Sequence, residues 1–66
     1  DSAGKIVGVE VKSAASVTAN DLAGLHKLAS IAGKKFVAGI VLYDGNETLP
    51  LGDNLWAVPL STLWND

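Results

Sequence analysis

The chain contains no cysteine, no methionine and no arginine, and it has a single histidine. Without cysteine it has no disulfides, and one histidine alone cannot form a structural zinc site. The lack of arginine and the net charge of −2 are atypical of a dedicated nucleic-acid-binding domain, which normally carries a basic patch. No apolar run approaches the roughly 20 residues of a membrane-spanning helix, and no segment resembles a signal peptide.

What is present is the composition of an ordinary small globular domain. The chain has 66 residues, of which 48 % are hydrophobic and 18 % are charged. A chain of this size buries only about 60 % of the surface that its unfolded form exposes, so its stability margin is thin. Because it begins with Asp1 and lacks methionine, we expect residues 1–66 to form a single partial domain, the C-terminal fragment of a larger protein.

The first regular segment, residues 5–12, alternates in the manner of a β-strand. Val7, Val9 and Val11 share one face, and β-branched residues favour strands. Glu10 and Lys12 share the other face with Ile6 and Gly8, which lack charge. Residues 1–4 are typical of a turn, so we expect that this strand has lost a hairpin partner and has an exposed edge.

A helix is predicted over residues 19–32. Thr18 and Asp21 form the pattern of a capping box at its start, and Gly33 followed by two lysines is typical of a helix end. The apolar residues recur every three or four positions and form one stripe: Leu22, Leu25, Leu28, Ala29 and Ala32.

Residues 36–43 carry no charge and have apolar side chains on both faces, which predicts a strand covered on both sides in the middle of a sheet. The remaining segments are shorter: a tight turn at 44–46, a possible hairpin arm at 47–49, a loop at 51–54, a strand at 55–58 and a helical turn from Pro59, in which Leu60, Leu63 and Trp64 share a face.

Strand, helix and strand in this order predict an α/β fold built on a βαβ unit. The two strands should be parallel with a right-handed crossover, and a short extra strand or hairpin and a terminal helical turn should follow. We expect the valine face to pack against the leucine stripe, which places Glu10 and Lys12 on the far face of the sheet. The predicted core is Val7, Val9, Val11, Leu22, Leu25, Leu28, Ile40 and Leu42.

Glu10 and Lys12 are the one pair of residues with a chemical mechanism. A carboxylate can bind a divalent cation, and an ammonium group two residues later on the same face can orient an attacking water or stabilise charge on a phosphoryl group. By spacing alone, such a pair on a half-exposed strand is more often a solvated ion pair. Both interpretations remain open at this point.

Four segments in order carry a resemblance to a known family: the strand "EVK", the helix "NDLAGLHKLA", the strand end "GIVLYDG" and the closing "LWAVPLSTLW". Together they resemble the C-terminal domain of unknown function of prokaryotic AAA-type ATPases, which is related to the PD-(D/E)xK, restriction-endonuclease-like nucleases. The resemblance implies a partial nuclease core, a cytoplasmic protein, and a parent that is an ATPase, a nuclease or both. It places Glu10 and Lys12 on the (D/E)xK half of the signature, with Glu10 as a ligand for Mg²⁺ in the complete domain.

The other half of the signature is not found here. The aspartate that completes such a metal site belongs to a preceding strand, and Asp1 lies in a predicted turn, so it does not inherit that role. The chain also has no Gly-rich phosphate-binding loop. His26 is interpreted as a surface residue beside the helix stripe rather than as a base or metal ligand, and Trp56 and Trp64 as core residues rather than as a stacking platform for bases.

Two functions follow from these observations. The first is a noncatalytic accessory or interaction module, which needs no cofactor; the alternative is a metal-dependent nuclease domain that acts on DNA when complete. The incomplete metal site, the absence of arginine and the negative net charge favour the module, with a vestigial or incomplete site at Glu10 and Lys12. Its expected partners are a second copy, bound through the exposed strand edge, and a parent ATPase module, with weak support for nucleic acid and none for a membrane.

Overall fold

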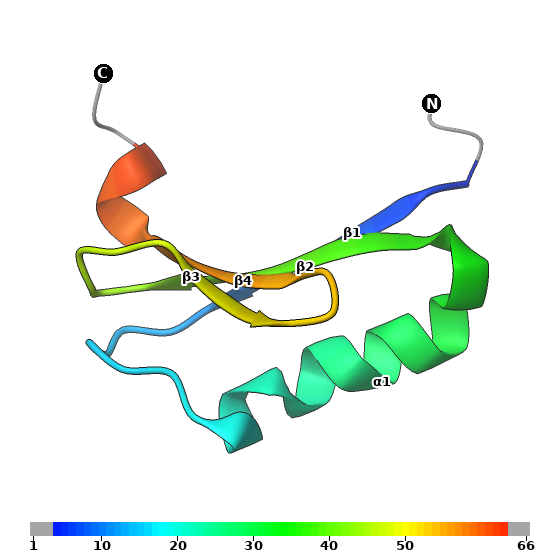
Figure 1. Cartoon of the computed structure of the whole chain (residues 1–66), viewed down its shortest axis with the longest axis horizontal. Coiled ribbons are helices and arrows are strands. Elements are labelled where there is room, and N and C mark those ends of the chain that lie inside the picture. Colours follow the sequence, from blue (N-terminus) through cyan, green and yellow to red (C-terminus); the bar gives the residue numbers. More distant parts are fainter. Residues whose placement is uncertain (1–3, 64–66) are drawn as a thin grey trace.

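A computed structural model describes residues 4–63. It consists of one four-stranded sheet with one α-helix against one face (Figure 1). The elements in chain order are β1 (Ile6–Val11), the 3₁₀ turn η1 (Ala19–Leu22), α1 (Ala23–Ala32), η2 (Gly33–Lys35), β2 (Phe36–Tyr43), β3 (Leu49–Gly52), β4 (Leu55–Pro59) and η3 (Leu60–Leu63).

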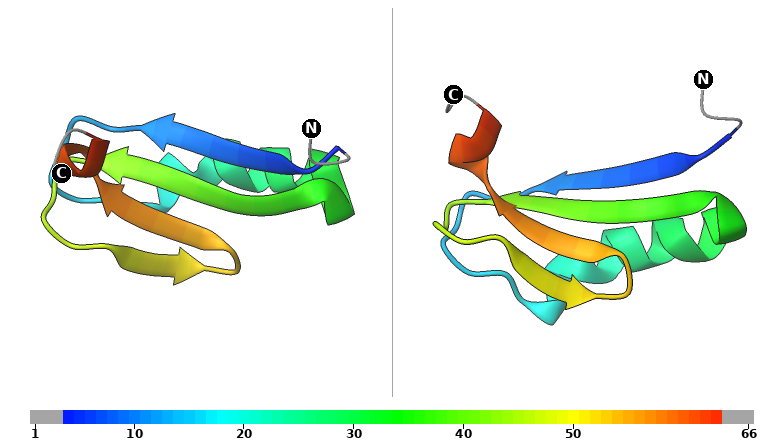
Figure 2. Two further views of the ribbon diagram at one scale, coloured as in Figure 1. Left: turned by 90° about the horizontal axis from the view of Figure 1, so that it is seen from above. Right: turned by 45° about the horizontal axis from the view of Figure 1, so that its top comes forward.

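The predicted βαβ unit is confirmed. The sheet has the strand order β1-β2-β4-β3, in which β1, β2 and β4 run parallel and β3 runs antiparallel to β4 (Figure 2). β2 lies in the middle of the sheet, and β1 is an edge strand, as the sequence predicted. The extra hairpin differs in its pairing, because β3 pairs with β4 through the turn at 53–54 and forms no arm that returns along β2.

The helical segment spans the predicted residues but begins as a 3₁₀ turn. The capping box of Thr18 and Asp21 is present at the start of η1, and α1 follows directly. Gly33 ends α1 with φ of 59°, a conformation that glycine adopts without the steric cost of a Cβ. Lys34 and Lys35 then lie in η2, where their charges complement the negative end of the helix dipole.

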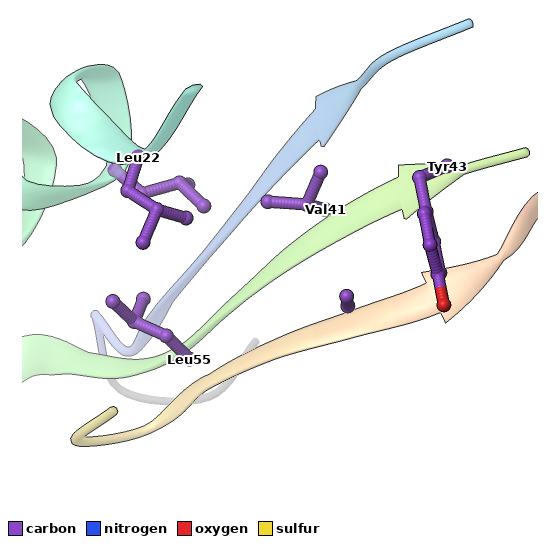
Figure 3. Packing of buried hydrophobic residues seen from close by; sticks show 6 residues of the cluster. Leu22, Val41, Tyr43 and Leu55 are labelled. Carbon is purple, nitrogen blue, oxygen red and sulfur yellow. The ribbon is translucent and has the colours of Figure 1, made fainter. Parts of the chain in front are cut away.

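The core lies between α1 and the sheet (Figure 3). Leu25 is only 4 % exposed, and it reaches the sheet beside the central strand. The strands β2 and β4 contribute the residues of their helix-facing side. The buried residues are Leu22, Leu25, Val41, Tyr43, Leu55 and Ala57, with Val17, Phe36 and Leu51 packed against them.

The predicted orientation of β1 is wrong. Val7, Val9 and Val11 are between 54 % and 62 % exposed, on the face of the sheet that α1 does not cover. Gly8 faces the helix instead: a Cβ at Gly8 would lie 2.7 Å from terminal methyl carbons of both Leu25 and Leu28. The helix approaches β1 so closely that the residue beneath it has no side chain, and the valines are therefore turned outward.

The uncovered face of the sheet is apolar throughout its central strands. Register places Val9, Ile40 and Trp56 in one row across β1, β2 and β4, and Val11, Leu42 and Val58 in the next. We call these six residues the open sheet face. Ile40 and Leu42 were predicted to be core residues but lie outside the buried core cluster, and Trp56, which was also predicted to be a core residue, is 44 % exposed. Trp64 lies outside the described residues.

Candidate functional site

The residues singled out by the sequence lie at the C-terminal end of β1, on the same side of the sheet as α1. This position corrects the expectation that Glu10 and Lys12 occupy the far face. Because side chains alternate along a strand, turning Gly8 toward the helix also turns Glu10 and Lys12 toward it. The carboxyl ends of parallel strands are where ligands commonly bind in α/β proteins.

Lys12 forms an ion pair with Asp21 of η1. The pair links the end of β1 to the start of the helical segment, and each side chain is about one-quarter exposed, 24 % for Lys12 and 23 % for Asp21. The predicted ion pair between Glu10 and Lys12 is thus replaced by one between Lys12 and a residue nine positions later in the chain.

Asp21 is also the cap that the sequence predicted. Its Oδ2 accepts hydrogen bonds from the backbone N–H of Thr18 at 2.7 Å and from the Thr18 hydroxyl at 2.9 Å. The same oxygen accepts a hydrogen bond from the Lys12 ammonium group. These donors, with Lys12 the largest influence and the Thr18 backbone next, lower the pKa of Asp21 to about 2.

Glu10 lies beside the first turn of α1. A Cβ at Gly24 would lie 3.8 Å from Glu10 Oε1, an ordinary van der Waals distance, so the Glu10 carboxylate lies against the start of α1.

The arrangement does not fit an Mg²⁺ site. Mg²⁺ requires several oxygen ligands in near-octahedral geometry, whereas Asp21 Oδ2 already accepts three hydrogen bonds. Within residues 4–63, no group of three or more histidine, cysteine, aspartate or glutamate side chains is placed to hold a metal ion.

His26 lies away from this cluster, on the exposed side of α1. It lines a cavity of about 330 Å³ together with Phe36 and the β3–β4 turn, which contributes Asp53 and Asn54. No spacing in the sequence indicated this cavity, because it forms between segments about 27 residues apart in the numbering. The interpretation of His26 as a surface residue is consistent with its exposure.

A match to one family model identifies the family of this chain. The family described as "Domain of unknown function (DUF4143)" matches residues 1–63. The chain belongs to this family. No curated protein and no solved structure matches it. The DUF4143 match covers every element from β1 to η3.

The Lys12–Asp21 pair of this DUF4143 chain predicts a specific loss of stability in acid. The ordinary pKa of aspartate is about 3.9, and the folded value is about 2. The ionised form therefore stabilises the fold above about pH 4, and this contribution is lost as the pH falls toward 2. Urea denaturation should show that Asp21→Asn lowers stability at pH 6 but much less at pH 2.

The control for this measurement is Glu47→Gln, which neutralises an exposed carboxylate in the loop before β3. Glu47→Gln should not reproduce the pH-dependent difference. An Asp21→Asn deficit of the same size at pH 6 and pH 2 would contradict the assignment of the effect to the ionised carboxylate.

Proposed function

We propose that this DUF4143 chain is a noncatalytic accessory module that associates with other polypeptides through β1. The observation that carries the proposal is the exposure of β1, a six-residue edge strand. Its valines are more than half exposed, with Val9 at 57 %. An apolar strand with an unpaired edge is a template for pairing with another chain.

The site at the end of β1 supports a noncatalytic role. Lys12 and Asp21 neutralise each other and join β1 to η1, so neither is free to act on a substrate. A nuclease-related fold does not by itself imply nuclease activity, and the contacts of Lys12 and Asp21 support structural roles for these two residues.

The direction of the backbone groups supports pairing at the outer edge of β1. Lys12 N–H donates to the carbonyl of Leu42 in β2 at 2.8 Å. Backbone N–H and C=O groups point to alternate sides along a strand. The backbone groups of Gly8 and Glu10 therefore also point toward β2, whereas those of Val9 and Val11 point outward, away from the sheet. Within residues 4–63, no strand pairs with this outer edge.

A second copy of the chain is a suitable partner for this edge. In an antiparallel pairing centred on Val9, Val9 lies opposite Val9 of the second copy, and Val7 lies opposite Val11. Cross-strand pairs of β-branched residues stabilise sheets. We therefore propose a homodimer with paired β1 strands, attached in a larger cytoplasmic protein to the AAA-type ATPase module that the sequence resemblance implies.

Sedimentation of two Val9 variants tests this pairing. Val9→Pro removes the outward N–H, a change that an edge strand tolerates, and should convert the dimer to a monomer. Val9→Thr keeps the N–H and a side chain of similar shape, so it should remain dimeric. A wild-type chain that stays monomeric at millimolar concentration, or a Val9→Pro chain that dimerises as well as Val9→Thr, would overturn the proposed pairing.

A second candidate function is a metal-dependent PD-(D/E)xK-type nuclease that acts on DNA when additional residues complete the site. The observation in its favour is that Glu10 and Lys12 share the carboxyl end of a parallel strand. Mg²⁺ would be the cofactor, with Glu10 as one ligand, and a further carboxylate from outside the described residues would be needed.

A plasmid-nicking assay with Mg²⁺ and Mn²⁺ separates the two functions. We expect no metal-dependent cleavage by the purified chain, because Glu10 alone offers one carboxylate and Lys12 adds positive charge close by. The matched variants are Glu10→Gln and Lys12→Ala. Cleavage that disappears in both variants would establish the nuclease, whereas cleavage that survives both would indicate a contaminating enzyme.

A further inference from the structure

One side of α1 is apolar and lies below the free edge of β1. Leu28 contacts the underside of β1, since a Cβ at Gly8 would lie 2.7 Å from Leu28 Cδ2. Gly24 lies beside Glu10 of the same strand, since a Cβ at Gly24 would lie 3.8 Å from Glu10 Oε1. Ile31 follows Leu28 by three positions and Gly24 by seven, so it lies on the same side of the helix. We call Gly24, Leu28 and Ile31 the lateral stripe; Gly24 and Ile31 are exposed, Ile31 by 76 %.

The proposed pairing of two β1 edges places a second copy of this stripe beside the first. α1 lies behind both β1 and β2 when the sheet is seen from above (Figure 2). Leu25 reaches both strands, since a Cβ at Gly8 or at Gly39 would meet its side chain. The helix axis is therefore displaced from β1 toward β2 by half of the strand spacing of about 4.8 Å. The two-fold axis of the pairing is perpendicular to the sheet and lies half a spacing from β1 in the opposite direction.

These positions bring the two α1 helices to packing distance. Each helix axis lies one strand spacing from the two-fold axis, so the two helices are about 10 Å apart. Because the axis is perpendicular to the sheet, they run antiparallel to each other on the same side of the joined sheet. Packed helices in proteins lie about 8–10 Å apart, so the strand pairing brings the two lateral stripes into contact.

The register of the strands determines which residues of the helices meet. Val9 lies between Gly8, which is above Leu28, and Glu10, which is beside Gly24. A two-fold axis at Val9 therefore passes between Gly24 and Leu28, and it places Gly24 of one copy opposite Leu28 of the second copy. A large side chain that faces a small one lets two packed layers interdigitate. Ile31 lies one turn beyond this contact, beside η1 of the second copy, and borders it.

We propose that the homodimer has a second layer of contact, in which the α1 helices of the two copies pack against each other through the lateral stripe, below the paired β1 strands. The inference deepens the proposed homodimer and rests on it. On each copy the strand layer measures about 20 by 10 Å and the helix layer about 15 by 10 Å, so the helices nearly double the interface. The total is below the roughly 800 Å² per partner of a stable complex, which places this dimer in the weak, transient class.

Gly24→Trp tests the helix contact without a change in β1. A single copy should tolerate this change, because Glu10 Oε1, at 3.8 Å from a Cβ at Gly24, is flexible and tryptophan has a higher helix propensity than glycine. In the dimer the indole would occupy the space of Leu28 of the second copy. Sedimentation up to millimolar concentration should therefore show dimerisation at least about tenfold weaker than that of the wild type. The matched control is Ser30→Trp, at an exposed position on another side of α1, which should dimerise as the wild type does.

A cysteine variant provides a second measurement if circular dichroism shows that Gly24→Trp does not fold. The chain has no cysteine of its own, so a short bis-maleimide reacts only at an introduced site. At a concentration where the wild type is dimeric, the reagent should cross-link two copies of Gly24→Cys and leave Ser30→Cys uncross-linked. Equal cross-linking of the two variants would overturn the helix contact.

The strand pairing and the helix contact can fail separately. A dimer that Val9→Pro dissociates and Gly24→Trp leaves intact would keep the paired β1 edge and overturn the helix contact. A dimer that Gly24→Trp dissociates and Val9→Pro leaves intact would keep the helix contact and overturn the paired edge. A wild-type chain that stays monomeric at millimolar concentration would overturn both.

Discussion

Truncation of Leu25 to Ala should lower the free energy of unfolding by about 2–5 kcal/mol. Leu25 is 4 % exposed and belongs to the core cluster. It contacts the helix-facing side of both β1 and β2, since a Cβ at either Gly8 or Gly39 would meet a terminal carbon of its side chain. Its removal would therefore leave a cavity at the centre of the contact between α1 and the sheet.

The expected loss is comparable to the whole stability of the domain. At about 0.05–0.15 kcal/mol per residue, a chain of 66 residues is stable by roughly 3–10 kcal/mol. Leu25→Ala should thus give a large drop in the urea midpoint or a chain that is unfolded at 25 °C. Ile31→Ala, at an exposed position of the same helix, should change stability by less than about 0.5 kcal/mol. Similar effects of the two variants would contradict the packing of α1.

The elements of the fold were predictable because each depends on local periodicity. The alternation in residues 5–12, the leucine stripe of 19–32 and the uncharged run of 36–43 each specify one kind of secondary structure. Parallel pairing then follows from the crossover connection. The β3–β4 hairpin was harder to predict, because residues 47–52 have no alternation that distinguishes pairing with β2 from pairing with β4.

The side of the sheet on which α1 lies was not predictable from alternation alone. Periodicity separates Val7, Val9 and Val11 from Gly8 and Glu10, but it does not say which set faces the helix. Valines favour burial, and this preference led to the wrong face. The signal that could have decided otherwise is Gly8, because a glycine in the middle of a strand often marks a close approach of another element.

The candidate site was predictable in its members and not in its contacts. Glu10 and Lys12 were recognised from a spacing of two residues, and the capping role of Asp21 from its spacing of three residues after Thr18. The Lys12–Asp21 ion pair required the connection at 12–18 to bring η1 back to the end of β1, and no local pattern describes that path. The exposed apolar face was missed together with the orientation of β1, because the valines of β1 were expected to lie against the helix.

Gly8→Val tests the orientation of β1, because the two orientations predict changes in stability of opposite sign. If the valine face were the buried one, Gly8 would face solvent, and valine there would stabilise the strand by up to about 1 kcal/mol through its β propensity. With Gly8 under α1, the added Cβ would lie 2.7 Å from carbons of Leu25 and Leu28. Overpacking of this kind typically costs about 1–3 kcal/mol.

The added Cβ would meet two side chains at once, and both Leu25 and Leu28 would have to move to admit it. Leu25 also packs against Gly39 of β2, since a Cβ there would lie 3.3 Å from Leu25 Cδ1. We therefore expect Gly8→Val to lower the urea midpoint even though valine is the better strand residue. Val9→Ala, one position away on the exposed face, should cost less than about 1 kcal/mol because little of its surface is removed from water on folding. A Gly8→Val chain more stable than the wild type would place the valines, and not the glycine, against the helix.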